Sequence, residues 1–344
     1  MELYDVTIIG GGASGLYSAF YSGLRDLKTK VIEYHPYLGG KLNVFLEKIL
    51  WDVGAQTPIM AEQLLKNLVT QAMTFSPTIC LNTKVNFIDK IDEYFVISTE
   101  AGEHYSKTVI IAIGGGIVQP IKLEIDGAEK FEMTNLHYTI KHIERFKNKE
   151  IIVSGGGNVA IDWAVELLPV AKKITVVYRG DELKAHEAFV NKLKANHIEI
   201  LVNATIKSLK SNHERTSIEK VIIDQNGVEL ERDVDDIIIC HGYNRDISLD
   251  FAESISPERK SGTLFQSIGQ CKTTIPGIFA VGDIVAYEDK VNLLVGTFQD
   301  AVLAVNSAKK YLQPDANPYA MVSSHNEKFI ERNQKVFNGN LVKK

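Results

Sequence analysis

A glycine-rich stretch near the start of the chain constrains the fold more than any other feature. Residues 7–15 read Thr-Ile-Ile-Gly-Gly-Gly-Ala-Ser-Gly, so that Gly10, Gly12 and Gly15 form a G-x-G-x-x-G pattern between an apolar strand and a helix. Such glycines allow a tight turn, close approach to a pyrophosphate and close helix–strand packing. The helix N-terminus offers free N–H groups to phosphate. A second strand ends at Glu33, where a carboxylate can bind a ribose hydroxyl. The stretch predicts a dinucleotide site.

A second glycine motif of this kind lies in the middle of the chain and reads G-x-G-x-x-A. Its candidate coenzyme contacts are Gly155, Gly157, Asn158, Val159 and Ala160. The strand that follows ends at Arg179, and Lys184 comes shortly after. An acid at the end of this strand would select NAD, whereas an arginine accommodates the 2′-phosphate of NADP. The motif therefore predicts an NADP site; the alternative is that Arg179 is an incidental surface residue.

The positions of the remaining glycines indicate how the two units are connected. An apolar strand ends in Gly282-Asp283, which presents a carboxylate at the strand edge where ligands gather and where it can bond a ribityl chain. Glycine-containing stretches at 114–120 and 241–245 are typical of a chain crossing between domains, and together they could form a hinge. We expect an α/β fold with two Rossmann-like domains. The NADP(H)-binding domain (117–243) is inserted in an FAD-binding domain made of residues 1–116 and 244–344.

Local patterns place further elements around these motifs. Apolar spacing predicts helices over 58–73 and 291–311. Alternating residues between 85 and 106 predict an antiparallel insertion. For two side chains the sequence allows two different roles. Trp51 is either a core residue or a flat face against a ring, and Lys41 either reaches phosphate or flavin or belongs to a surface turn.

Composition excludes several function classes. The chain has 344 residues, a net charge of −5 and no long basic run, which argues against nucleic-acid binding. No apolar run approaches the length of a membrane span. Cys80, Cys240 and Cys271 are far apart, a pattern that fits a reducing compartment and argues against a disulfide framework or a metal site. We expect a cytoplasmic protein without a metal, nucleic-acid or membrane partner.

The order of these parts resembles the flavoproteins with two dinucleotide-binding domains, and within them the thioredoxin-reductase-like (type 2) ferredoxin–NADP(+) reductases of bacteria. The resemblance covers nearly the whole chain. The motifs that carry it are Leu-Gly-Gly-Lys-Leu (38–42), Trp-Asp-Val-Gly (51–54), Asn-Leu-His-Tyr (135–138), Gly-Gly-Gly-Asn (155–158), Val-Tyr-Arg (177–179), Ala-His-Glu (185–187) and Gly-Asp (282–283).

The resemblance implies FAD and NADP as cofactors, ferredoxin or flavodoxin as the redox partner, and a homodimer. It implies that Trp51 stacks on the isoalloxazine ring and that a tail histidine, His325, covers the opposite face. The implied FAD contacts are Ser14, Glu33, Lys41, Phe45, Val85, Val118, Asp283 and Ser324. Gly40 would let the main chain pass close to the bound dinucleotide. Hydride would pass from NADPH to the flavin, which releases electrons singly, so no protein general base is required.

The chain departs from the family pattern at several positions. Thioredoxin reductases carry a C-A-T-C disulfide where this chain reads Thr-Ile-Lys-His (139–142), so a dithiol relay is absent. Where the family usually has a pair of arginines, this chain has Arg179-Gly180, and where the family has a later arginine, this chain has Lys184. The tail reads Ser-Ser-His (323–325), in a different order from the family's. Two alternatives stay open: a reductase with another acceptor, such as a quinone, oxygen or a small disulfide, and a flavin-binding sensor without turnover. The second nucleotide motif favours turnover.

Overall fold

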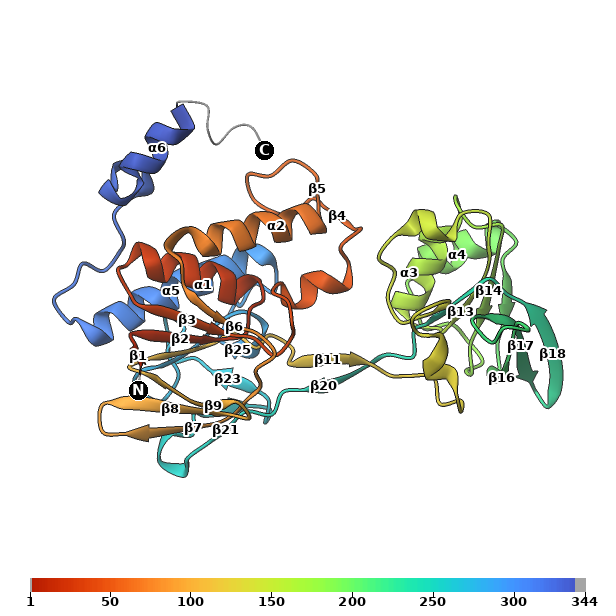
Figure 1. The fold of residues 1–344 in the computed structure, drawn as a ribbon, viewed down its shortest axis with the longest axis horizontal. Helices are drawn as coiled ribbons and strands as arrows, with labels where there is room; N and C mark the ends of the chain where they lie inside the picture. Colours follow the sequence, from red (N-terminus) through yellow and green to blue (C-terminus); the bar gives the residue numbers. More distant parts are fainter. Residues whose placement is uncertain (1, 338–344) are drawn as a thin grey trace.

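The computed structural model of the protein describes residues 2–337 and has two lobes joined by two strands (Figure 1). The first lobe contains both described ends of the chain, and the second lobe comprises residues 121–242. Each lobe is built on its own five-stranded parallel sheet. The two sheets share one arrangement, because in each the strand before the glycine loop is central.

The first parallel sheet has the strand order β24-β10-β2-β3-β6. Its strands are β2 (Val6–Ile9), β3 (Thr29–Ile32), β6 (Thr78–Cys80), β10 (Val109–Ile111) and β24 (Ile278–Ala280). Strands β2, β10 and β24 are continuous runs of apolar or β-branched residues that are buried throughout, as expected for a sheet covered on both faces. All neighbouring strands are parallel, so their carboxyl ends meet at one edge.

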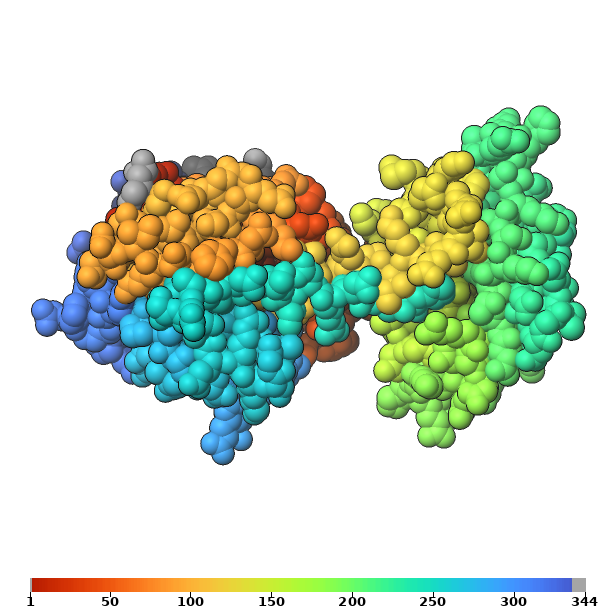
Figure 2. Space-filling view, turned by 90° about the horizontal axis from the view of Figure 1, so that it is seen from below, coloured from red at the N-terminus to blue at the C-terminus, as the bar shows by residue number. Residues whose placement is uncertain are grey.

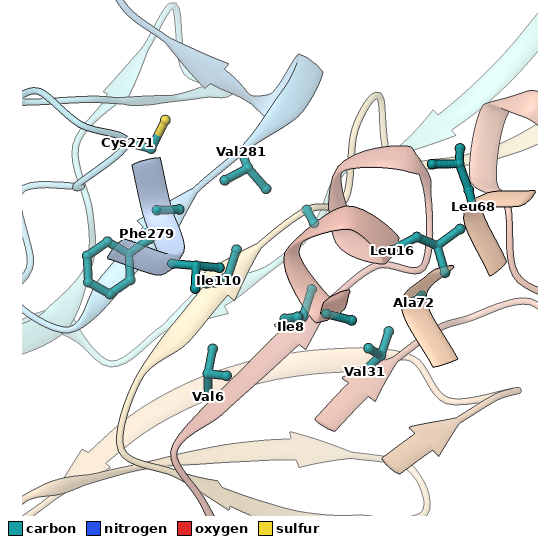
Figure 3. Close-up of a cluster of buried hydrophobic side chains, with 14 of the residues drawn as sticks. Val6, Ile8, Leu16, Val31, Leu68, Ala72, Ile110, Cys271, Phe279 and Val281 are labelled. Carbon is teal, nitrogen blue, oxygen red and sulfur yellow. The ribbon is translucent and has the colours of Figure 1, made fainter. Parts of the chain in front are cut away.

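Three helices cover one face of this sheet: α1 (Ala13–Leu24), α2 (Ala61–Ala72) and α5 (Leu294–Leu312). Leu16 of α1 packs against the β-strand residues Ile8 and Val31, with Leu68 of α2 nearby (Figure 3). Phe279, Val281 and the buried thiol of Cys271 continue the same core toward α5. Burial of such side chains stabilises the lobe by about 1.5–3 kcal/mol for each large one.

A mixed sheet covers the other face, with the order β1-β9-β8-β7-β21; β7, β8 and β9 are antiparallel to one another, whereas the edge strands β1 and β21 run parallel to their neighbours. Its strands are β1 (Leu3–Tyr4), β7 (Val85–Ile91), β8 (Tyr94–Thr99), β9 (Gly102–Ser106) and β21 (Asp250–Phe251). Smaller strands complete the lobe: β4 (Ile49–Leu50) with β5 (Ile59–Met60), and β22 (Arg259–Lys260) with β23 (Leu264–Gln266) and β25 (Val285–Ala286). The antiparallel insertion expected between residues 85 and 106 is therefore present.

The second parallel sheet has the order β12-β19-β13-β14-β15. Its strands are β12 (Leu136–His137), β13 (Glu150–Ser154), β14 (Lys173–Val177), β15 (Glu199–Leu201) and β19 (Asp236–Ile239). Helices α3 (Asn158–Leu167) and α4 (Glu187–Ala195) pack on one side. An antiparallel sheet of β16 (Ala204–Ser211), β17 (Ile218–Gln225) and β18 (Val228–Asp233) packs on the other.

Strands β11 (Ile117–Pro120) and β20 (Tyr243–Asp246) connect the lobes and pair antiparallel with each other. Figure 2 shows them as a narrow waist between the two masses of atoms. A second contact bridges the lobes beside this waist. Lys48 Nζ lies 2.6 Å from Asp162 Oδ2, also contacts the Glu166 carboxylate, and lies 4.5 Å from the centre of the Trp163 ring.

Two of the expected helices begin later than the apolar spacing indicates. The segment expected as a helix from Pro58 is extended at Ile59–Met60, because these residues pair with Ile49–Leu50, and α2 begins at Ala61. The last long helix, α5, begins at Leu294 rather than at Val291. Helix α6 (Ile330–Phe337) ends the described chain. No helix between residues 2 and 337 has both the length and the apolar character needed to cross a membrane.

Candidate functional site

The first glycine loop joins β2 to α1 at the carboxyl edge of the first parallel sheet. Gly10 has φ = +107°, and a Cβ there would overlap the Ala112 carbonyl oxygen. A Cβ on Gly15 would overlap the Gly10 carbonyl oxygen. The loop can therefore adopt this turn only with glycine at both positions, and it leaves the first N–H groups of α1 open at the sheet edge.

Glu33 follows β3 and lies under this loop with 6% of its surface exposed. Its Oε2 accepts the Gly11 N–H at 2.6 Å and its Oε1 accepts the His35 N–H at 2.8 Å. These bonds fix the carboxylate, and since a carboxylate has about four acceptor sites, it can still accept a ribose hydroxyl.

A second wall is formed by segments that are distant in sequence. The Gly39 N–H donates to the Gly11 carbonyl at 2.8 Å, and a Cβ on Gly40 would lie 2.9 Å from Gly12 Cα. On the other side, a Cβ on Gly282 would lie 2.8 Å from Ser14 Oγ. Lys41 Nζ lies 3.9 Å from Asp283 Oδ2. The structure thus brings Gly10, Gly12, Ser14, Gly15, Glu33, Gly40, Lys41 and Asp283 together in a cradle lined by main chain, which fits an extended dinucleotide.

Four other predicted residues lie in the same lobe or on the connection. Phe45 ends the short 3₁₀ turn after Gly40 and packs on the core. Val85 is buried at the start of β7, and Val118 on β11 pairs with Arg245. Trp51 follows β4 and is 76% exposed, so the core reading of this tryptophan is wrong and a flat face remains available.

Ser324 and His325 are not brought together with the other residues. They form an exposed 3₁₀ turn in which Ser324 Oγ lies 3.0 Å from His325 Nδ1. The next turn is fixed by Lys328, whose Nζ donates to the Gly23 carbonyl at 2.9 Å. Gly23 is at the end of α1 opposite the glycine loop, and the 12-residue helix is about 18 Å long. A contact between His325 and a ring at the loop would need a displaced tail or a second copy of the chain.

The second glycine loop joins β13 to α3 at the carboxyl edge of the second sheet. Gly155 has φ = +148°, and a Cβ there would lie 2.5 Å from the Cys240 carbonyl oxygen. A Cβ on Gly157, in contrast, would meet no atom within 4 Å. Asn158 Oδ1 accepts the His186 N–H at 2.9 Å, and the Lys184 N–H donates to the Gly156 carbonyl at 2.7 Å. Val159 is exposed and Ala160 is buried.

Two cations border this second loop. Arg179 lies two residues after the end of β14, and Lys184 forms an isolated parallel β-bridge with Gly157. Both side chains are exposed, and among residues 2–337 neither has a carboxylate within salt-bridge distance. They are therefore available to a phosphate at the end of β14, where a dinucleotide's adenosine ribose would lie.

Sequence reasoning missed several groups at these edges. His241 follows β19, and its Nε2 lies 2.8 Å from Ser154 Oγ. Partial desolvation of the ring lowers the pKa of this imidazole, and the nearby Arg179 charge lowers it further. Asp300 on α5 is fully buried behind Gly282 and binds its N–H. The sequence could have indicated Asp300, because it is an acidic residue on the apolar face of an expected helix. Its contact with Gly282 could not be predicted, because it depends on the fold.

Two glycine loops with different surroundings, each at the carboxyl edge of a parallel sheet, define a two-nucleotide oxidoreductase. Residues 4–308 match the family described as pyridine nucleotide-disulphide oxidoreductase. The chain is 53% identical to ferredoxin–NADP reductase 3 of Lysinibacillus sphaericus, over 99% of each chain. It is 50% identical to ferredoxin–NADP reductase 1 of Oceanobacillus iheyensis, over 98% of each chain. The thioredoxin reductase of Lactococcus lactis in its FR conformation has a TM-score of 0.67 and 26% identity, covering 90% of this chain and 99% of that one.

The chain therefore belongs to the pyridine nucleotide-disulphide oxidoreductase family, within its thioredoxin-reductase-like ferredoxin–NADP reductase branch. The expected α/β fold, with one Rossmann-like unit inserted in another, is confirmed. FAD and NADP(H) are the cofactors of this enzyme class, and the cradle around Gly10–Gly15 fits the former.

Proposed function

We propose that the protein takes hydride from NADPH onto FAD and passes single electrons to ferredoxin or flavodoxin. The observation that carries this proposal is the combination of two dinucleotide loops with an absence of paired thiols. All three cysteines are free, and the segment 139–142 contains none. Electrons must then leave from the flavin itself. Relatives about 50% identical over the full chain carry the name ferredoxin–NADP reductase, which supports the choice of acceptor.

We assign the FAD site to the first lobe (1–116 and 244–344) and the NADP(H) site to the inserted segment 117–243. Glu33 would hold the adenosine ribose, while Ser14, Lys41 and Asp283 would lie along the phosphates and the ribityl chain. Bound there, FAD supplies a hydride acceptor that can release electrons one at a time. Phe45, Val85 and Val118 would complete the walls of the site. The exposed ring of Trp51 is our candidate for one face of the flavin, and His325 with Ser324 for the other, given the rearrangement noted above.

In the inserted segment, Gly155, Gly157, Asn158, Val159 and Ala160 would hold the pyrophosphate of NADPH. Arg179 and Lys184 would bind its 2′-phosphate, because both cations are exposed beside the loop. A general base is not assigned, because hydride transfer to flavin requires none.

We also propose a cytoplasmic homodimer. Three unpaired cysteines fit a reducing compartment. Exposed apolar side chains gather on the C-terminal segment, including Tyr319, Met321, Val322 and Ile330, and a partner chain would remove them from water. Sedimentation of the purified protein tests the dimer, and a monomer at all concentrations would contradict it.

Anaerobic stopped-flow kinetics tests the function. The protein is reduced with one equivalent of NADPH and mixed with ferredoxin, flavodoxin, thioredoxin or oxygenated buffer. We expect rapid oxidation by ferredoxin or flavodoxin and slow oxidation by thioredoxin and oxygen. Rapid oxidation by oxygen alone would instead indicate an oxidase, and failure of NADPH to reduce the flavin would indicate a sensor.

A further inference from the structure

A buried carboxylate lies directly behind the turn that carries Asp283. Asp300, on the face of α5 that packs against the sheet, is 0% exposed. It accepts three hydrogen bonds: Oδ1 from the Tyr287 hydroxyl at 2.6 Å, and Oδ2 from Lys290 Nζ at 2.6 Å and from the Gly282 N–H at 3.0 Å.

This cluster differs from a surface ion pair in its burial and its completeness. The Lys290 side chain is only 8% exposed, so two opposite charges are held together away from water. Buried charges are tolerated when they are paired and hydrogen-bonded, and here the carboxylate has both kinds of partner. Burial raises the pKa of Tyr287, and the bond to Asp300 raises it further, so the phenol stays protonated and donates.

All three donors belong to one short segment, residues 282–290. Gly282 begins the 3₁₀ turn Gly282–Ile284 that presents Asp283, while Tyr287 and Lys290 lie at the end of the segment, before α5. Gly282 has φ = +74° and leaves no room for a Cβ beside Ser14 Oγ. A single carboxylate therefore anchors both ends of the segment and holds its first residue against the first turn of α1.

We propose that Asp300, together with Lys290 and Tyr287, is a positioning residue for FAD: it holds the Gly282–Asp283 turn at the distance from α1 that the dinucleotide requires. This inference rests on the proposed assignment of Asp283 to FAD. Asp300 does not touch the cofactor itself, because Gly282 lies between them. Its loss should weaken FAD binding even when the lobe stays folded.

The test separates positioning from general stability by replacing the ion pair as a unit. The double variant Asp300→Leu/Lys290→Met keeps the volume and removes both charges, a change that is often neutral for folding. It also removes the acceptor of the Gly282 N–H. Apoprotein of the full chain is prepared, its melting temperature is measured, and FAD is titrated by quenching of flavin fluorescence.

We expect a melting temperature a few degrees below that of the parent, because the Gly282 N–H and the Tyr287 hydroxyl lose their buried acceptor. We expect the Kd for FAD to rise about tenfold or more, because the Gly282–Asp283 turn is no longer held against α1. The matched control is Asp236→Leu/Lys149→Met in the second lobe. There an equally buried carboxylate lies 2.6 Å from Lys149 Nζ and also binds His137. This control should leave the Kd for FAD unchanged.

A Kd for FAD equal to that of the parent in the Asp300→Leu/Lys290→Met variant would overturn the positioning role. If that variant does not fold, Tyr287→Phe takes its place, since it removes one donor to Asp300 and leaves the ion pair. We then expect a severalfold weaker Kd together with a changed shape of the flavin absorption band, and a Kd and band identical to the parent's would overturn the proposal. A parent protein that binds no FAD would contradict the proposed function instead, so the two failures are distinguishable.

Discussion

The two glycine loops have nearly the same sequence pattern but opposite surroundings. The first is enclosed: Glu33 lies beneath it, Gly39–Gly40 cover one side, and the Gly282 turn contacts Ser14 on the other. The second is closed at Gly155 by the Cys240 carbonyl but open at Gly157, where a Cβ would meet nothing within 4 Å, and the neighbouring Arg179 and Lys184 are exposed to solvent. The motif itself specifies a pyrophosphate, whereas the surrounding segments decide how easily that pyrophosphate leaves.

This difference corresponds to the two roles that a flavoprotein reductase needs. A cradle closed by three separate segments suits a cofactor that stays bound through many turnovers. A loop bordered by exposed cations suits a coenzyme that must bind and leave in each cycle. The first loop carries a fixed acid, which we assign to a ribose hydroxyl, and the second carries exposed cations, which we assign to a phosphate.

The largest expected difference between the two loops comes from adding one methyl group to each of them. Gly15→Ala forces a Cβ into the Gly10 carbonyl, so we expect the Kd for FAD to rise by up to about a hundredfold, the upper end of the roughly 1–3 kcal/mol of strain at such sites. Gly157→Ala has open space at an extended N-cap residue, so FAD content should match the parent. Flavin absorbance per chain measures both. Equal flavin content in the two variants would show that the close packing of Gly15 on Gly10 is not required for FAD binding.

The second prediction concerns the cation of the open loop. A guanidinium on a phosphate contributes roughly 1.5–3 kcal/mol, equivalent to about tenfold to a hundredfold in affinity. Arg179→Ala should therefore raise the KM for NADPH by this factor and leave the KM for NADH nearly unchanged. Steady-state reduction of ferricyanide with each coenzyme measures the ratio. Equal changes for NADPH and NADH would show that Arg179 does not recognise the 2′-phosphate.

The third prediction concerns the contact that holds the two loops in one relative orientation. Lys48 bridges Asp162, Glu166 and the Trp163 ring across the lobes, and its side chain is largely buried. Such a contact contributes about 1–2 kcal/mol, or roughly fivefold to thirtyfold in the population of this orientation. Lys48→Ala should broaden the distribution of interlobe distances seen by small-angle scattering. Lys207→Ala, which removes an exposed pair within the second lobe, is the control and should leave the distribution unchanged.

The smallest effect is expected from the thiols, which belong to neither loop. Burial raises the pKa of Cys240 to about 12 and also raises that of Cys271, so both remain protonated at neutral pH and react poorly. The triple Cys→Ser variant, once folded, should reduce a one-electron protein acceptor at close to the parent rate. If the parent reduces thioredoxin and the variant does not, a disulfide relay is present instead.

Features that depend on a few neighbouring residues were predictable from the sequence. The two glycine loops and the buried strands beside them follow from local apolar runs and from the conformations that only glycine adopts. Glu33 and Arg179 could be singled out because each closely follows the strand after its loop. Other features depend on contacts between distant segments. Ile59–Met60 is extended because Ile49–Leu50 pairs with it, and the anchor between Asp300 and Gly282 joins a helix to a turn. The position of His325 likewise follows from the contact of Lys328 with α1.

The pairing of β11 with β20 has a further consequence for how such an enzyme can change over generations. Pro120 is the register partner of Tyr243, so the inserted segment leaves the first lobe and returns to it at adjacent points. A segment with adjacent ends can be exchanged by recombination without stretching the part that receives it. On the assignment proposed above, coenzyme preference and flavin chemistry lie in separable pieces, so that residues 121–242 could be replaced while the sequence around the flavin stays as it is.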